Sequence, residues 1–161
     1  MSAIALRQLA AVASGGASET AVFIAEEKQK SRQQLQDSYA LGQLGKGSLN
    51  ELYRIFAECH QANWDGYGAA PVSVLAFQLA CEFLEALPLG TPAPSIGAEP
   101  DGHITLEWYH SPRRTLSISV SPEGDLHYAA LTGASKAYGT EPFFDEVPKE
   151  IMDLIHRITA A

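Results

Sequence analysis

Three short runs of alternating apolar and polar residues constrain the fold of this chain more than any other feature. They are His103–Tyr109, Thr115–Val120 and Leu126–Leu131, and Pro-containing turns separate them. Alternation with a period of two places successive side chains on opposite faces of a strand. The three runs therefore predict an antiparallel meander with one apolar face and one polar face.

The turn residues fix the register of this meander. We treat Pro122-Glu123-Gly124 as a three-residue hairpin loop, with Pro at the first turn position and Gly in the left-handed conformation. The same reading of Pro100-Asp101-Gly102 adds a fourth strand, Ser95–Glu99. The predicted cross-strand pairs are Ala98–Ile104, Ile96–Leu106, Leu106–Ile118, Trp108–Leu116, Leu116–Ala130, Ile118–Tyr128 and Val120–Leu126. All three connections then agree on one core face, because a slip of one residue would invert it.

Three amphipathic segments are expected to cover that core face. Ser48 starts an S-x-x-E capping box that predicts a helix over Leu49–Ala62. Apolar residues at helical spacing predict two more helices, Pro71–Leu87 and Pro148–Thr159. We expect residues 132–145 to be irregular. The predicted fold class is α+β: a four-stranded antiparallel meander packed on one face by about three helices.

The first 45 residues are expected to form a separate helical arm. Residues 2–13 and 18–39 have helical patterns, and the second is too polar to be a core helix throughout. Gly42, Gly45 and Gly47 then indicate a linker. The predicted organisation is a helical N-terminal arm over 1–45, mobile or partner-binding, and a compact α+β domain over 46–161.

Charge and composition exclude several classes of function. The formal net charge is −8, and all of it lies beyond residue 60, where 13 acidic residues face five basic ones. Such a surface disfavours nucleic-acid binding. No apolar run approaches the roughly 20 residues of a membrane helix. Cys59 and Cys81 have neither a paired metal-binding spacing nor a disulfide-rich frame, so we expect reduced core thiols and a cytoplasmic location.

The polar face of the sheet is the first candidate for a functional surface. The register places Thr105, Ser119 and His127 in one row across three strands, with Glu107 and Ser117 in the next. A Ser–His–Glu arrangement can be drawn from these residues. However, Ser119 has no oxyanion hole and no sharp nucleophile turn, which acyl-transfer catalysis requires. A binding surface and an ordinary solvated sheet both remain open.

The loop Asn63–Pro71 is the second candidate, with the sequence Asn-Trp-Asp-Gly-Tyr-Gly-Ala-Ala-Pro. Trp64 and Tyr67 can pin the loop to the core or remain free for a ligand, and Asp65-Gly66 can form a turn. The glycine spacing does not match a phosphate-binding loop. The only local group of potential metal ligands is Cys59-His60 beside Asp65, and we expect no metal and no cofactor.

The loop and the strands together resemble a group of small uncharacterised bacterial proteins. A Trp-Asp-Gly-x-Gly-Ala loop is followed by an Ile-x-Leu-Glu-Trp strand, and the resemblance covers about residues 61–158. It implies a bacterial origin and a soluble, compact product. It carries no catalytic residue over to this chain.

These observations favour a non-enzymatic bacterial cytoplasmic protein that binds a protein partner, in an antitoxin-like, immunity-like or complex-accessory role. Partner-binding residues are expected on the loop and the polar face: Trp64, Asp65, Tyr67, Glu107, Tyr109 and His127. The alternative is a small enzyme or ligand-binding domain that uses Asp65, Glu107 and His127. A second alternative is nucleic-acid binding through the N-terminal arm.

Overall fold

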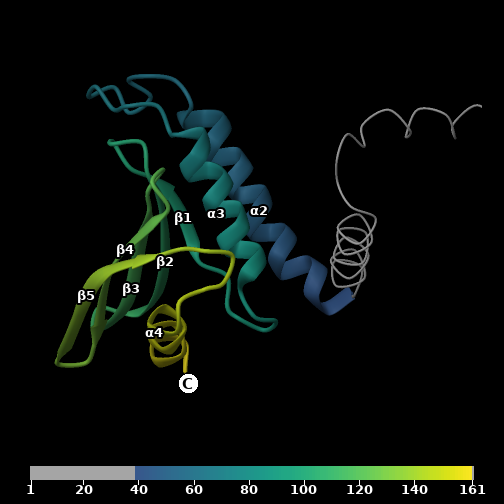
Figure 1. The fold of residues 1–161 in the computed structure, drawn as a ribbon, viewed down its shortest axis with the longest axis vertical. Helices are drawn as coiled ribbons and strands as arrows, with labels where there is room; N and C mark the ends of the chain where they lie inside the picture. The colour runs from purple at the N-terminus through teal and green to yellow at the C-terminus, as the bar shows by residue number, and fades with distance from the viewer. Residues whose placement is uncertain (1–38, 161) are drawn as a thin grey trace, which may run out of the picture. The chain divides into compact units, whose positions relative to one another are not determined.

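A computed structural model describes residues 39–160, with side chains from residue 46 onward. These residues form an α+β fold around a single antiparallel sheet (Figure 1). The helix predicted over 2–13 lies outside the described residues, as does the helix predicted over 18–39 except for its last residue. Within the described part of the chain, no helix is both long enough and apolar enough to cross a membrane.

The sheet has five strands, one more than the sequence predicts, and the strands neighbour one another in chain order. Every neighbouring pair is antiparallel. The strands are β1 (Ser95–Ala98), β2 (Ile104–Ser111), β3 (Arg114–Val120), β4 (Asp125–Thr132) and β5 (Ser135–Pro142). The predicted register is confirmed at all three connections; for example, Ile96 pairs with Leu106, Trp108 with Leu116 and Ile118 with Tyr128.

Strand β5 corrects the expectation that residues 132–145 are irregular. A tight turn with Gly133 in the left-handed conformation (φ 69°) returns the chain along β4. The inward side of β5 is made of Ala137, Gly139 and Glu141, so it shows no apolar alternation. Small residues are required there, because a Cβ atom on Gly139 would lie 2.8 Å from the hydroxyl of Tyr128. A large apolar residue at this position would displace that ring.

Two of the predicted helices are confirmed closely. Helix α3 (Val74–Ala86) starts after Ser73, whose side chain accepts a hydrogen bond from the amide of Ala76. Helix α4 (Lys149–Thr159) follows Pro148, and its buried stripe is Ile151, Leu154, Ile155 and Ile158.

Helix α2 (Tyr39–Cys59) corrects both the predicted linker and the predicted helix start. Gly42, Gly45 and Gly47 lie inside this helix, and Ser48 is a buried residue within it rather than a cap. Each glycine costs a helix only about 1 kcal/mol relative to alanine. Favourable packing further along, such as the complete burial of Leu52, offsets a cost of that size. The helix ends at Cys59 instead of Ala62.

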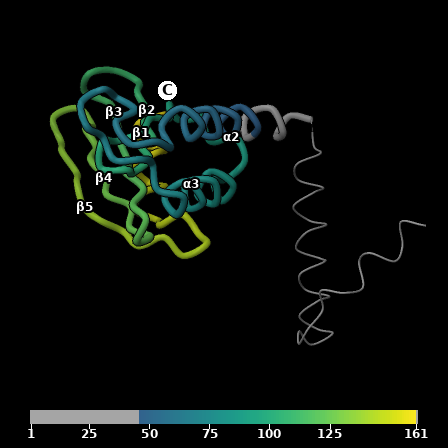
Figure 2. Tube along the Cα trace, turned by 90° about the horizontal axis from the view of Figure 1, so that it is seen from above, coloured from purple at the N-terminus to yellow at the C-terminus, as the bar shows by residue number. Residues whose placement is uncertain are grey.

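The core lies between the apolar face of the sheet and the helices. Helices α3 and α4 pack directly on the strands, and α2 runs beside α3 (Figures 1 and 2). The α2–α3 contact includes the stacked rings of Phe56 and Phe77, with centroids 4.4 Å apart. Ten predicted core-face residues point inward: Ile104, Leu106, Trp108, Leu116, Ile118, Val120 and Leu126 are buried, and Ile96, Ala98 and Tyr128 are partly buried against them.

Candidate functional site

The face of the sheet opposite the helices, called here the open face, presents the polar half of every strand. No described helix packs on this face. Its central strands carry the side chains that the register predicts, and β5 adds three that the sequence analysis misses. The open face comprises Thr105, Glu107, Tyr109, Thr115, Ser117, Ser119, His127, Lys136, Tyr138 and Thr140.

The predicted row of Thr105, Ser119 and His127 is confirmed, but its hydrogen bonds are not those of a catalytic triad. The hydroxyl of Ser119 lies 3.1 Å from Nδ1 of His103 instead of bonding to His127. His127 shares a 2.9 Å hydrogen bond with Thr140 on β5. Among the described residues, no hydrogen bond or ion pair joins Glu107 to His127. Ser119 and His127, two members of the possible Ser–His–Glu relay, therefore have other partners.

Two tyrosines dominate the exposed part of the open face. Tyr109 is 63% exposed and Tyr138 is 82% exposed. Tyr138 lines a shallow hollow of about 300 Å³ that is open to solvent. Glu107 and Lys136 also line this hollow, so an acidic and a basic side chain lie near Tyr138.

The 63–71 loop is held by its own side chains. The indole Nε1–H of Trp64 donates to the carbonyl of Ala70 at 2.9 Å. The Oδ1 atom of Asp65 accepts from the amides of Tyr67 (2.8 Å) and Ala69 (3.1 Å). Trp64 and Asp65 therefore define the shape of the loop.

Trp64 and Asp65 have side-chain hydrogen bonds within the loop, whereas the side chain of Tyr67 is almost fully exposed. Hydrogen bonds from the amides of Tyr67 and Ala69 lower the pKa of Asp65, because they stabilise its ionised form. Tyr67 itself is 95% exposed. In the described residues no hydrogen bond or ion pair connects Asp65 with Glu107 or His127. Of the three predicted loop residues, Tyr67 has the most exposed side chain.

The same loop supports the turn between β1 and β2. The amide of Ala70 donates to the carbonyl of Pro100 (2.8 Å), and the amide of Ser73 donates to the carbonyl of Gly102 (2.9 Å). Gly102 has φ 92°, and a Cβ atom there would lie 2.8 Å from the carbonyl oxygen of Pro71. The close approach fixes this turn against the loop.

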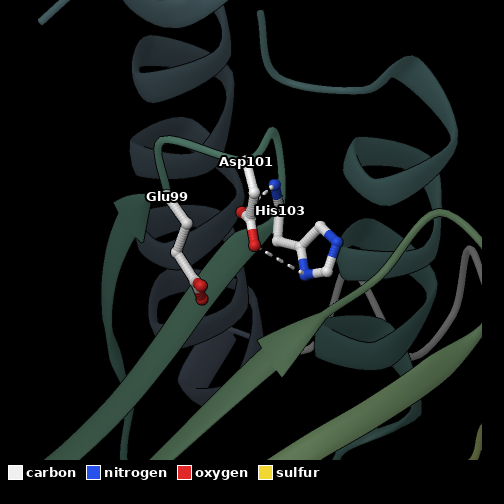
Figure 3. A group of neighbouring side chains, drawn as sticks. All are labelled: Glu99, Asp101 and His103. Carbon is white, nitrogen blue, oxygen red and sulfur yellow. Dashed lines mark hydrogen bonds and ion pairs between the residues drawn. The ribbon is translucent and has the colours of Figure 1, made fainter. Parts of the chain in front are cut away.

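Three potential metal ligands lie together on that turn, and they were not predicted from the sequence. Glu99, Asp101 and His103 project from the β1–β2 hairpin, with Asp101 and His103 facing each other (Figure 3). We call them the hairpin group. The alternating Glu-x-Asp-x-His pattern around a turn is the sequence signal that could have identified it.

The metal-ligand candidates that the sequence does suggest are engaged elsewhere. Nδ1–H of His60 donates to the carbonyl of Ala57 at 2.7 Å. The thiol of Cys59 is buried, and burial raises its pKa. Burial also raises the pKa of Cys81 to about 11. Both thiols are free and protonated near neutral pH.

The described surfaces thus offer an exposed aromatic sheet face, one exposed loop tyrosine and a compact group of ligand atoms. Compared with protein-family models, curated protein sequences and solved structures, the chain has no significant match.

Proposed function

We propose that this protein is a non-enzymatic bacterial cytoplasmic protein that binds a protein partner through the open face of its sheet. The observation that carries the proposal is the exposure of Tyr109 and Tyr138 on a sheet face that no described helix covers. Tyrosine is enriched in the centres of protein interfaces, because it buries a large apolar ring and still offers a hydroxyl group.

The chemistry of the hollow supports a protein partner over a small molecule. Small-molecule sites are usually concave pockets of about 300–1,000 Å³ that bury about 70–90% of the surface of a ligand. The hollow on the open face has about 300 Å³ but is shallow, and between its charged and aromatic residues it is lined by alanines, Leu131 and the short hydroxyl side chains of Thr115 and Ser117. Glu107 and Lys136 at its margins would set the orientation of a partner by charge complementarity.

Substitution of the two exposed tyrosines tests the proposal. The full-length protein is used to isolate a binding protein from the cells that produce it, and the purified pair is then titrated. We expect the Tyr109→Ala/Tyr138→Ala variant to weaken binding by about 30-fold or more, the effect of a central interface residue. Circular dichroism checks that the variant is folded.

The matched control is Tyr53→Ala. Tyr53 is 58% exposed, similar to Tyr109, but it lies on α2 in the helix layer. Unchanged affinity for Tyr53→Ala together with a loss for the sheet variant supports the open face as the binding surface. Equal affinity of the wild-type protein and the folded double variant would refute it. A Tyr67→Ala variant then measures the contribution of the loop.

A further inference from the structure

We propose that the hairpin group of Glu99, Asp101 and His103 binds a divalent zinc ion. Among the described residues these three form the group whose ligand atoms all lie within 4.8 Å of one another. The inference is independent of the partner-binding proposal, because it depends only on the ligand atoms of one hairpin.

The geometry needs little adjustment to enclose a zinc ion. Nδ1 of His103 and Oδ2 of Asp101 are 3.7 Å apart. Zinc bonds of about 2.0–2.2 Å in tetrahedral arrangement place neighbouring ligand atoms about 3.3–3.6 Å apart. The third ligand, Glu99, has the longest side chain of the group and can move its free oxygen inward by rotation about its own bonds.

The donor set favours zinc over the common hard cations. It combines one imidazole nitrogen with two carboxylate oxygens, and zinc accepts nitrogen and oxygen ligands together. Mg²⁺ and Ca²⁺ prefer oxygen ligands alone. Three protein ligands leave a fourth tetrahedral position for water. We therefore expect a weaker response to Mg²⁺ and Ca²⁺ than to Zn²⁺.

The hairpin holds the ligands in place before a metal ion arrives. The amide of Gly102 donates to the carbonyl of Glu99 (3.0 Å), and the 63–71 loop supports Pro100 and Gly102 from outside. The hydroxyl of Thr105 donates to Oε1 of Glu99 at 2.5 Å and leaves the second oxygen free. Such outer hydrogen bonds orient a ligating carboxylate.

The charge around the hairpin group favours a cation. In the described part of the chain, neither Glu99 nor Asp101 forms an ion pair with lysine or arginine; the partner of Asp101 is His103. Two carboxylates therefore lie close together without a permanent positive neighbour. A bound zinc ion would neutralise both.

The hydroxyl of Ser119 competes with the metal for Nδ1 of His103. This hydroxyl lies 3.1 Å from Nδ1 of His103, the atom that also faces Asp101. Nδ1 has one lone pair, so it cannot accept a hydrogen bond and coordinate zinc at the same time. Zinc binding must replace the Ser119 contact, and removing that hydroxyl is expected to leave the affinity unchanged or raise it.

Zinc titration of the full-length, chelator-treated protein tests the site, with isothermal calorimetry or a competing chromophoric chelator as the readout. We expect His103→Ala to weaken zinc binding by about 100-fold, since loss of even an outer partner costs 10–100-fold. Asp101→Asn is the second variant: Asp101 is exposed, and the amide oxygen can still accept from the amide of His103. Thr105→Val should weaken binding about tenfold, and Ser119→Ala should not weaken it.

His127→Ala is the matched control, because its ring is stacked 6.2 Å from that of His103 but lies outside the hairpin group. Retained zinc affinity in this control supports the assigned ligands. A loss equal to that of His103→Ala would overturn them, as would equal affinity of wild type, His103→Ala and Asp101→Asn. Substitution with Co²⁺ adds a spectroscopic check: an absorption band from thiolate ligation would place the metal at a cysteine and refute the site.

Discussion

Asp65 is a predicted site residue whose carboxylate also stabilises the loop that carries it. Its position in a distinctive loop suggested recognition or catalysis, and its carboxylate accepts hydrogen bonds from two amides of the same loop. Such bonds are typical of Asp in tight turns, because the short side chain reaches the backbone two residues ahead. These hydrogen bonds give Asp65 a structural role within the loop.

The lowered pKa of Asp65 predicts a specific pH dependence. A carboxyl group with a lowered folded-state pKa adds stability above its unfolded-state pKa, and this contribution disappears as the pH falls through the folded-state value. Asp65→Asn should therefore lower the melting temperature near pH 7, and the difference from wild type should shrink at the acidic end of the titration. Thermal unfolding followed by circular dichroism between pH 7 and pH 2 measures it; a difference that does not change with pH would contradict the assignment.

Gly102 is the residue at which backbone conformation and close packing coincide. Gly102→Ala should destabilise the fold by about 1–3 kcal/mol from the strained backbone alone, and the contact with the carbonyl of Pro71 should add to this cost. The control is Gly124→Ala, which has φ 90° but open space around the added Cβ. Urea denaturation should show the larger loss for Gly102→Ala. Equal losses would mean that the 63–71 loop moves aside freely.

At the scale of helices and strands, the largest correction concerns the glycines of α2. Three glycines within six residues are typical of a linker, and a capping box follows them, so local sequence favoured a helix start at Leu49. The helix instead continues through all of them. Glycine lowers helix stability without preventing helix formation where other contacts compensate.

Gly47→Ala distinguishes a helix from a linker at this point. A Cβ atom at Gly47 meets nothing within 4 Å, so the substitution should stabilise the protein by about 0.8–1 kcal/mol through helix propensity. Urea denaturation at constant slope measures the change. Gly66→Ala is the comparison with opposite sign, since Gly66 also has open space but has φ 76°. No gain for Gly47→Ala would indicate that the helix is broken there in solution.

At the scale of the whole molecule, charge is the main determinant of which partners are possible. The sequence beyond residue 60 carries the entire net charge of −8. A negative surface repels phosphate backbones and increases the rate of encounter with basic partners.

The full-length protein is accordingly expected not to bind nucleic acid. Fluorescence anisotropy with labelled duplex DNA and with single-stranded RNA should show no binding at 50 mM salt, where electrostatic binding is already much stronger than at 200 mM. Tight binding that weakens steeply with added salt would contradict this expectation and favour the N-terminal arm as a nucleic-acid-binding segment.

The sequence by itself determined the meander and its register. Alternating residues and two Pro-x-Gly turns specify which side chains pair, because a slip of one residue would expose the whole core face. It also located α3 and α4, where apolar spacing agrees with a Ser cap at the start of α3 and a Pro at the start of α4. Residues close together in the chain specify these features, so local sequence patterns are enough to predict them.

Only the tertiary structure decided the features that depend on distant contacts. Strand β5 lacks an apolar pattern because its inward side must leave room for Tyr128. The hydrogen bond between Ser119 and His103 joins residues that are 16 positions apart in the chain. The spacing of the hairpin group is present in the sequence, but the support of its turn by the hydrogen bond from Ala70 to Pro100 is a tertiary contact. Contacts between segments far apart in the chain are a property of packing, which periodicity alone does not encode.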